Sequence, residues 1–164
     1  MRRNKSERGS SIVEGGLVAV FVLIPILLGS IDFGRAFYVS IEVANAAKAG
    51  AQYGAQSQAD MADTTHIAAV AEAEAPDVST TCGTGKNACW VSGYPTSSWG
   101  CECSTTATAG GGTVGSTSCT CPGGHVVDFV LVTTKATYTP MFNLFGWFKP
   151  ITLNSSAKMR WALQ

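Results

Sequence analysis

The sequence predicts an α+β protein in which a long N-terminal helix crosses a membrane and then packs against a small antiparallel sheet outside it. Three features predict this fold: an apolar run near the N-terminus, an alanine-rich helical pattern that continues beyond it, and two C-terminal segments rich in β-branched residues. The formal net charge of the 164 residues is zero, so we expect no nucleic-acid partner.

The apolar run extends from Ile12 to Ile31 and contains one ionisable residue, Glu14. Its 20 residues match the number that a helix needs to cross a hydrocarbon core of about 30 Å. Four basic residues precede it: Arg2, Arg3, Lys5 and Arg8. Basic residues beside a first span hold that side of the span in the cytoplasm. We therefore expect a single-pass inner-membrane protein, with residues 1–9 as a cytoplasmic leader and residues 10–31 as the transmembrane helix.

A cleaved secretory signal peptide is the main alternative for this segment, because it also has a basic start and an apolar middle. The run is long for a signal peptide, and no Ala-x-Ala cleavage site follows it. Six cysteines, all beyond position 80, agree with a C-terminal part that lies in the oxidising periplasm or outside the cell.

The helical pattern does not stop at the membrane. Aromatic and β-branched residues recur at helical spacing as far as Gln58, which predicts one helix from about Ser11 to Gln58 with a kink at Pro25. A second helix is expected from Asp60 to Ala75, since Pro76 disfavours helix in the residue before it. Residues 32–76 would thus form a helical stalk outside the membrane.

Residues 77–164 are expected to form a cystine-rich antiparallel β domain. The clearest strands are Val126 to Thr139 and Ile151 to Trp161. In the second strand the residues at alternate positions share one face: Ile151, Leu153, Ser155, Ala157, Met159 and Trp161. The apolar connection 140–150 is expected to be a hairpin lid or a contact surface.

The cysteines form three groups: Cys82 with Cys89, Cys101-x-Cys103, and Cys119-x-Cys121. Residues two apart in a strand face the same side, so two Cys-x-Cys strands in an antiparallel hairpin would join Cys101 to Cys121 and Cys103 to Cys119. That pairing leaves Cys82 for Cys89, and it is a geometric preference among 15 possible connectivities. A four-thiolate zinc site is the alternative, although zinc sites usually have Cys-x2-Cys spacing, so we expect no metal.

A carboxylate inside an apolar span costs at least ~2.5 kcal/mol and therefore needs a partner or a function. Glu14 is the fifth residue after Gly9, and a basic leader precedes both. This arrangement resembles the processing site of type IV prepilins. Cleavage between Gly9 and Ser10 would create an amine that can neutralise Glu14 in the same or a neighbouring subunit. The alternative is that Glu14 lies near the interface and snorkels.

The following residues extend the resemblance: Leu23-Ile24-Pro25-Ile26-Leu27-Leu28-Gly29, Ile31-Asp32-Phe33-Gly34-Arg35-Ala36-Phe37-Tyr38 and Val43-Ala44-Asn45-Ala46-Ala47-Lys48-Ala49-Gly50-Ala51-Gln52-Tyr53-Gly54-Ala55. Residues 8–56 are similar to the TadE-like minor pseudopilins of tight-adherence (Flp-type) pilus systems. The segment from Ile151 to Arg160 also resembles that family's final strand. The cysteine-rich middle matches no pattern of the family, and its usual aromatic residue after the Glu is Gly15 here.

The resemblance implies a pilin-like fold, processing by a prepilin peptidase, and a part in pilus assembly, initiation or anchoring. The expected partners are the inner membrane, other pilins or pseudopilins and the pilus assembly machinery. Two other hypotheses remain open. The first is a membrane-tethered binding module that is not a pilin. The second, an oxidoreductase using a Cys-x-Cys pair, has less support.

Small residues form ridges on the helix just outside the membrane. Ala46, Gly50 and Gly54 are spaced by four, as small residues are where another helix approaches closely. Helix propensity is the alternative explanation, but the two glycines each cost ~1 kcal/mol in a helix interior. Asp32 and Arg35 are three residues apart on the same face and could pair at the membrane boundary, either as a solvated pair or in a structural role.

No catalytic constellation is present in the sequence, so we expect neither an enzyme nor a cofactor. The segment from Gly83 to Lys86 contains a Gly-Lys pair without the spacing of a phosphate loop, and it is expected to be a turn. His66 and His125 are isolated and are expected to be surface residues.

Overall fold

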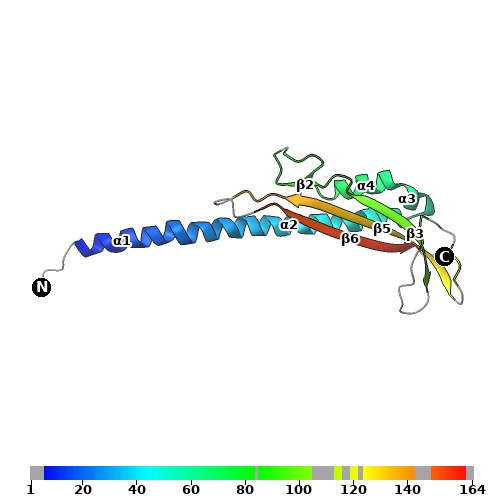
Figure 1. The fold of residues 1–164 in the computed structure, drawn as a ribbon, viewed down its shortest axis with the longest axis horizontal. Coiled ribbons are helices and arrows are strands. Elements are labelled where there is room, and N and C mark those ends of the chain that lie inside the picture. The colour runs from blue at the N-terminus through cyan, green and yellow to red at the C-terminus, as the bar shows by residue number, and fades with distance from the viewer. Residues whose placement is uncertain are drawn as a thin grey trace.

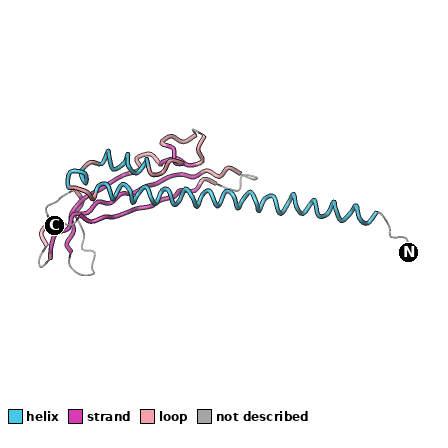
Figure 2. The backbone as a smooth tube through the Cα atoms, turned by 180° about the vertical axis from the view of Figure 1, so that it is seen from behind, coloured by secondary structure: helices cyan, strands magenta, loops and turns pink. Residues whose placement is uncertain are grey.

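The computed structural model describes residues 6–83, 85–104, 113–115, 119–121, 124–142 and 149–161. It confirms the α+β plan, with a long N-terminal helix that projects from one end of a small domain and packs on a sheet along its second half (Figures 1 and 2). Residues 143–148, which include most of the expected lid, lie outside the described part.

The long helix consists of three consecutive segments: α1 (Ser6–Val18), a π-helical turn η1 (Ala19–Leu23), and α2 (Ile24–Gly54). The backbone N–H of Ile24 bonds to the carbonyl of Ala19, five residues back. Pro25 follows directly. In a regular α-helix its ring would clash with the carbonyl four residues earlier, and it has no N–H to donate to that carbonyl. The wider π turn accommodates this exclusion at the place where the sequence predicted a kink.

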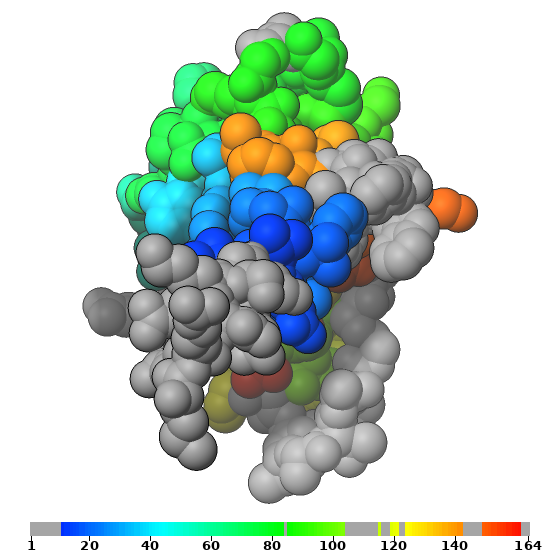
Figure 3. Space-filling model, turned by 90° about the vertical axis from the view of Figure 1, so that its left-hand side faces the viewer, coloured from blue at the N-terminus to red at the C-terminus, as the bar shows by residue number. Residues whose placement is uncertain are grey.

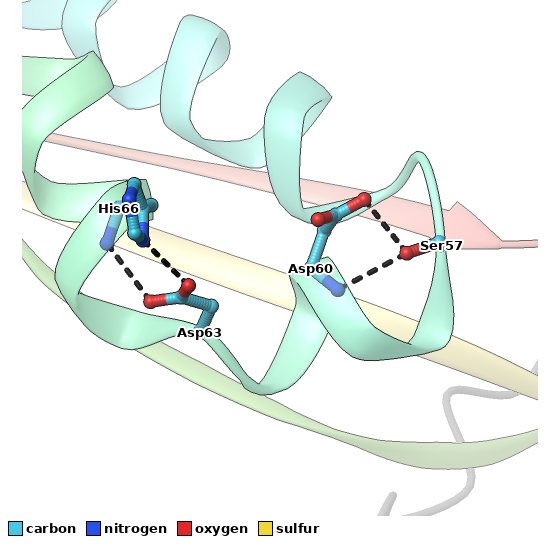
Figure 4. A network of polar contacts seen from close by, with 4 residues as sticks. All are labelled: Ser57, Asp60, Asp63 and His66. Carbon is cyan, nitrogen blue, oxygen red and sulfur yellow. Dashed lines mark hydrogen bonds and ion pairs between the residues drawn. The ribbon is translucent and has the colours of Figure 1, made fainter.

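The second helical region is divided in two, so the prediction of one continuous helix from Asp60 to Ala75 is wrong near its start, at Asp63. The segments are α3 (Gln58–Ala62) and α4 (Thr64–Ala73). Asp63 interrupts them with φ −85° and ψ 77°, and its side chain caps α4 by accepting the N–H of His66 at 3.0 Å. Ser57 caps α3 in the same way through the N–H of Asp60 (Figure 4). The two N-caps, Ser57 and Asp63, are six residues apart and favour two short helices over one.

The sheet contains β1 (Val78–Ser79), β2 (Ala88–Trp90), β3 (Thr96–Ser104), β4 (Thr113–Val114), β5 (His125–Tyr138) and β6 (Ile151–Trp161). Its centre is β5, which pairs with β6 on one side and with both β2 and β3 on the other. All pairs are antiparallel except β1 with β2. The two strands that the sequence predicted are thus confirmed, β6 with identical bounds and β5 shifted by one residue.

One face of the sheet is covered by α2 and α4 (Figure 1). Alternate residues of β5 point to these helices and are buried: Val130, Val132, Thr134, Ala136 and Tyr138. Two apolar clusters fill the space. One joins Val39 and Val43 to Trp90 and Tyr138, and the other joins Ala51, Met61 and Ile67 to β5. The helices of residues 32–76 therefore share their core with the strands of residues 77–164.

Candidate functional site

The apolar run from Ile12 to Ile31 contains no buried residue. The helix from Ser11 to Gly54 is long and apolar enough to cross a membrane, and its most apolar window has no buried residue. Ile12, Phe21 and Leu27 are 76%, 71% and 61% exposed. An apolar helix with no protein cover needs a lipid environment or the helices of other subunits.

The expected processing and assembly residues lie at the start of this helix. Gly9 and Ser10 belong to α1, but their side chains lie outside the described part. Glu14 is exposed one turn further along, and it makes no hydrogen bond or ion pair with any described residue. Within one subunit, then, the described residues leave the carboxylate of Glu14 free for a partner.

The small-residue ridge contacts another element of the same chain. Ala46, Gly50 and Gly54 are buried, and a Cβ on Gly50 would lie 3.2 Å from the carbonyl oxygen of Ile67 and from Val132. A Cβ on Gly54 would lie 2.9 Å from Ile67 Cδ1. The glycines thus allow α4 and β5 to approach α2 closely, and this ridge is not available to a second subunit.

The opposite face of α2 exposes a different ridge. Phe33, Phe37 and Ile41 are spaced by four and are 75%, 62% and 45% exposed. They continue the exposed apolar surface of the membrane span beyond its outer end. In the sequence these residues contribute to the helical periodicity, which does not show that they are exposed. Their exposure becomes evident once the sheet is known to cover the other side of the helix.

Asp32 connects the long helix to the end of β5. Its two carboxylate oxygens accept the backbone N–H groups of Met141 and Phe142 at 3.0 and 2.9 Å, and Tyr138 Oη donates to its backbone carbonyl at 3.3 Å. Among the described residues Asp32 forms no ion pair with Arg35, and its carboxylate has a structural role through the two backbone donors. Burial raises the pKa of Tyr138, and the negative charge of Asp32 raises it further.

Glu42 is a buried acid on α2 that the sequence analysis did not identify. It is 7% exposed, and its Oε2 atom has no hydrogen-bond partner among the described residues. Burial and the nearby charge of Asp77 raise the pKa of Glu42, against hydrogen bonds from Tyr38 and the backbone of Asp77. No local pattern marked Glu42, because its neighbour Asp77 lies 35 positions further along the sequence.

Three disulfides join all six cysteines: Cys82 to Cys89, Cys101 to Cys119, and Cys103 to Cys121. The predicted pairs Cys101 with Cys121 and Cys103 with Cys119 are therefore wrong. The antiparallel neighbour of Cys101 is Thr113 in β4, not a cysteine strand. The chain reverses again after β4, with Gly115 at φ +79°, so residues 119–121 run in the same direction as residues 101–103.

The cystine-rich end also contains a buried charge cluster. Glu102 is 6% exposed and forms ion pairs with Lys158 and with Arg160, the latter at 2.5 Å. Burial raises the pKa of Glu102, but the hydrogen bonds from the two cations outweigh it and hold the pKa below its usual value. Asp128 is 5% exposed and its Oδ1 atom has no partner among the described residues, so burial raises its pKa.

The described residues contain no group of three His, Cys, Asp or Glu side chains that could hold a metal ion. His125 is exposed, and the exposed His66 bonds through Nδ1 to the carboxylate of Asp63 at 2.6 Å (Figure 4). Gly83 and Gly85 have φ near +90°, in keeping with the predicted turn. These residues present no arrangement that resembles an active site.

The fold and the exposed helix define an α+β protein in which a helix that is long and apolar enough to cross a membrane also forms one layer of the folded domain. A comparison with protein families adds the particular type. Residues 9–52 match the family model described as TadE-like protein, in agreement with the resemblance found in the sequence. No curated protein and no solved structure matches this chain. The N-terminal segment is thus similar to TadE-like proteins.

Proposed function

We propose that this protein is a minor pilin or pseudopilin that acts in the assembly, initiation or anchoring of a tight-adherence pilus, by helix packing and not by catalysis. The observation that carries the proposal is the exposed Glu14, five residues after Gly9 at the start of an uncovered apolar helix that matches the TadE-like family. A prepilin peptidase would cut between Gly9 and Ser10, and the domain would lie outside the inner membrane.

The ionic partner of Glu14 would be the amine released at Ser10. The two residues are four apart, so they lie on the same side of the helix one turn from each other. In lipid an ion pair is poorly screened and far stronger than in water, so the pairing can fix the axial position of one subunit against the next. The ridge of Phe33, Phe37 and Ile41 would continue that contact outside the membrane.

Glu14→Gln tests the proposal in a strain that lacks the wild-type gene. Glutamine keeps the shape and enters a membrane more easily than glutamate, so we expect a stable, processed protein that fails to support normal pilus numbers. Glu7→Gln is the matched control, because Glu7 would be removed with the leader. Normal piliation with Glu14→Gln would contradict the role of Glu14.

Intact mass measurement of protein from native membranes tests the cleavage separately. The expected mature chain begins at Ser10. A chain that still begins at Met1 would favour a membrane-tethered binding module, and a chain that begins near Ile31 would indicate a cleaved signal peptide. Replacing Gly9 with a bulky residue should leave the leader attached.

A further inference from the structure

A cavity of about 400 Å³ lies where α2 leaves the membrane-spanning run. One wall is the helix itself, with Ile31, Arg35 and Tyr38. The other wall consists of Asp77, which directly precedes β1, and of Lys86 and Asn87 in the connection between β1 and β2. Figure 3, which looks at this end of the molecule, places the green residues of that connection above the blue helix. The volume lies within the range of pockets that bind small ligands.

The position of the cavity along the helix corresponds to lipid headgroups. Ile31 ends the apolar run and lines the cavity, and Arg35 lies four residues beyond it. Four helical residues rise by about 6 Å, and each headgroup layer of a bilayer is about 5–7 Å thick. When the apolar run spans the membrane, Arg35 therefore lies at the depth of the lipid phosphates.

The donors around the cavity suit a phosphate group. Arg35 is exposed and forms no ion pair with any described residue. Lys86 is exposed and uses one N–H on the carbonyl of Pro76, which leaves two N–H groups free. The Nδ2 atom of Asn87 is buried and has no acceptor among the described residues. A phosphate oxygen would accept from all three, and its bonds to the two cations would be charge-assisted.

The cavity also has a carboxylate. Asp77, directly before β1, is exposed on the wall opposite α2, and the buried Glu42 contacts the backbone of Asp77. A purely anionic ligand would face repulsion from Asp77, whereas a ligand with both a phosphate and an ammonium group matches both charges. Ile31 gives the cavity an apolar lip on its membrane side.

We propose that this cavity binds the headgroup of an amine-bearing phospholipid from the adjacent leaflet, with its phosphate on Arg35 and Lys86 and its ammonium group on Asp77. The inference requires the membrane span but neither cleavage at Gly9 nor pilus assembly. A protein that retains its leader would still bind the lipid, so the failure of one proposal is distinguishable from the failure of the other.

Native mass spectrometry of the full-length protein tests this inference. The protein is placed in nanodiscs with equal amounts of phosphatidylethanolamine and phosphatidylglycerol and then released into a mild detergent. We expect one retained phosphatidylethanolamine, with occupancy reduced roughly tenfold by Arg35→Gln and by Lys86→Gln, because charge-assisted bonds are the stronger ones. Lys48→Gln is the matched control, since Lys48 is an exposed cation of the same helix outside the cavity.

The adduct mass separates the possible sources of phosphate. Equal lipid retention by all four proteins would show non-specific lipid and overturn the site. Retention of free phosphate alone would overturn a lipid ligand. Equal retention of both lipids, unchanged by Asp77→Asn, would overturn the assignment of the amine. Arg35→Lys guards against a folding defect: it should retain more lipid than Arg35→Gln, and equal loss in both would contradict the charge contact.

Discussion

Asp32 accepts the backbone N–H of Met141 across 109 positions of sequence, and it accepts that of Phe142 with its other oxygen. A residue at the outer end of the membrane helix thereby fixes the start of the connection between the two longest strands. Hydrogen bonds to a charged acceptor contribute about 1.5–3 kcal/mol each, more than bonds between neutral groups.

Asp32→Ala removes both of these bonds, so we expect the free energy of unfolding to fall by about 3–6 kcal/mol. We also expect faster hydrogen exchange at the amides of Met141 and Phe142. Chemical denaturation in detergent and exchange mass spectrometry measure the two effects. Glu74→Ala removes an exposed acid of the same domain and is expected to change neither. Unchanged exchange at residues 141 and 142 would contradict the role of Asp32.

Gly50→Leu is expected to destabilise the domain by about 1–3 kcal/mol, as overpacking of a filled core does. The new side chain would meet a backbone carbonyl, which cannot move aside as a flexible side chain can. Gly34→Leu is the matched control, because a Cβ at Gly34 meets nothing within 4 Å. Thermal unfolding of both variants measures the difference. Equal melting temperatures would show that α4 does not pack closely on Gly50.

Cys101→Ser is expected to leave one free thiol at Cys119. Alkylation under denaturing, non-reducing conditions followed by tandem mass spectrometry locates the label. Label on Cys121 would instead support the antiparallel hairpin pairing and contradict the second chain reversal after β4. The wild-type protein should show no label, and Cys82→Ser should label Cys89 alone.

Asp128→Asn is expected to stabilise the domain near neutral pH. The folded-state pKa of Asp128 is raised by burial, so the folded protein binds the proton more tightly than the unfolded chain does. The stability that protonated Asp128 contributes is therefore lost as the pH rises from the pKa of the unfolded chain to the raised pKa of the folded state. It does not return at higher pH. Asparagine avoids that loss because it has no charge.

Denaturation from pH 7 to pH 4 measures the effect. The advantage of Asp128→Asn should shrink as the pH falls through the folded-state pKa. Subtracting the wild-type curve cancels the opposite contribution of Glu102, whose lowered pKa stabilises the fold only above its usual titration range. An Asn variant that is less stable than wild type at pH 7 would show that Asp128 has an ionic partner.

Phe37→Gln is expected to impair pilus assembly without loss of stability. Phe37 is 62% exposed, so its replacement removes little from the core. Pilus counts in a deletion strain, together with the melting temperature of the purified protein, test both parts. Lys48→Gln, also exposed on α2, should assemble normally. A melting temperature lowered by several degrees would assign Phe37 to folding.

The features that the sequence predicted well are those with a local signal. The bounds of β6 follow from its alternation, and the long helix follows from its periodicity and its lack of charge. The cystine pairing was wrong because β4 has only two residues, Thr113 and Val114, and carries no pattern that reveals a second reversal. The sequence around Asp63 likewise does not distinguish a helical residue from the N-cap of α4.

Other features depend on contacts between distant segments. The glycines of α2 indicated close packing, but nothing local shows that the partner is α4 of the same chain. The same holds for Asp32, because its partners are backbone N–H groups, which do not depend on the type of side chain. Burial of Glu42 likewise depends on a connection more than thirty positions away.

The wide turn at Ala19–Leu23 has a consequence for the azimuth of the N-terminal segment. Each α-helical residue advances by about 100°, so a turn that holds one extra residue offsets everything upstream by roughly that angle. The direction of Glu14 relative to the sheet therefore follows from this turn and from Pro25, which prevents its tightening. In a filament with fixed subunit positions, Pro25 would thus help to determine which neighbouring subunit Glu14 faces.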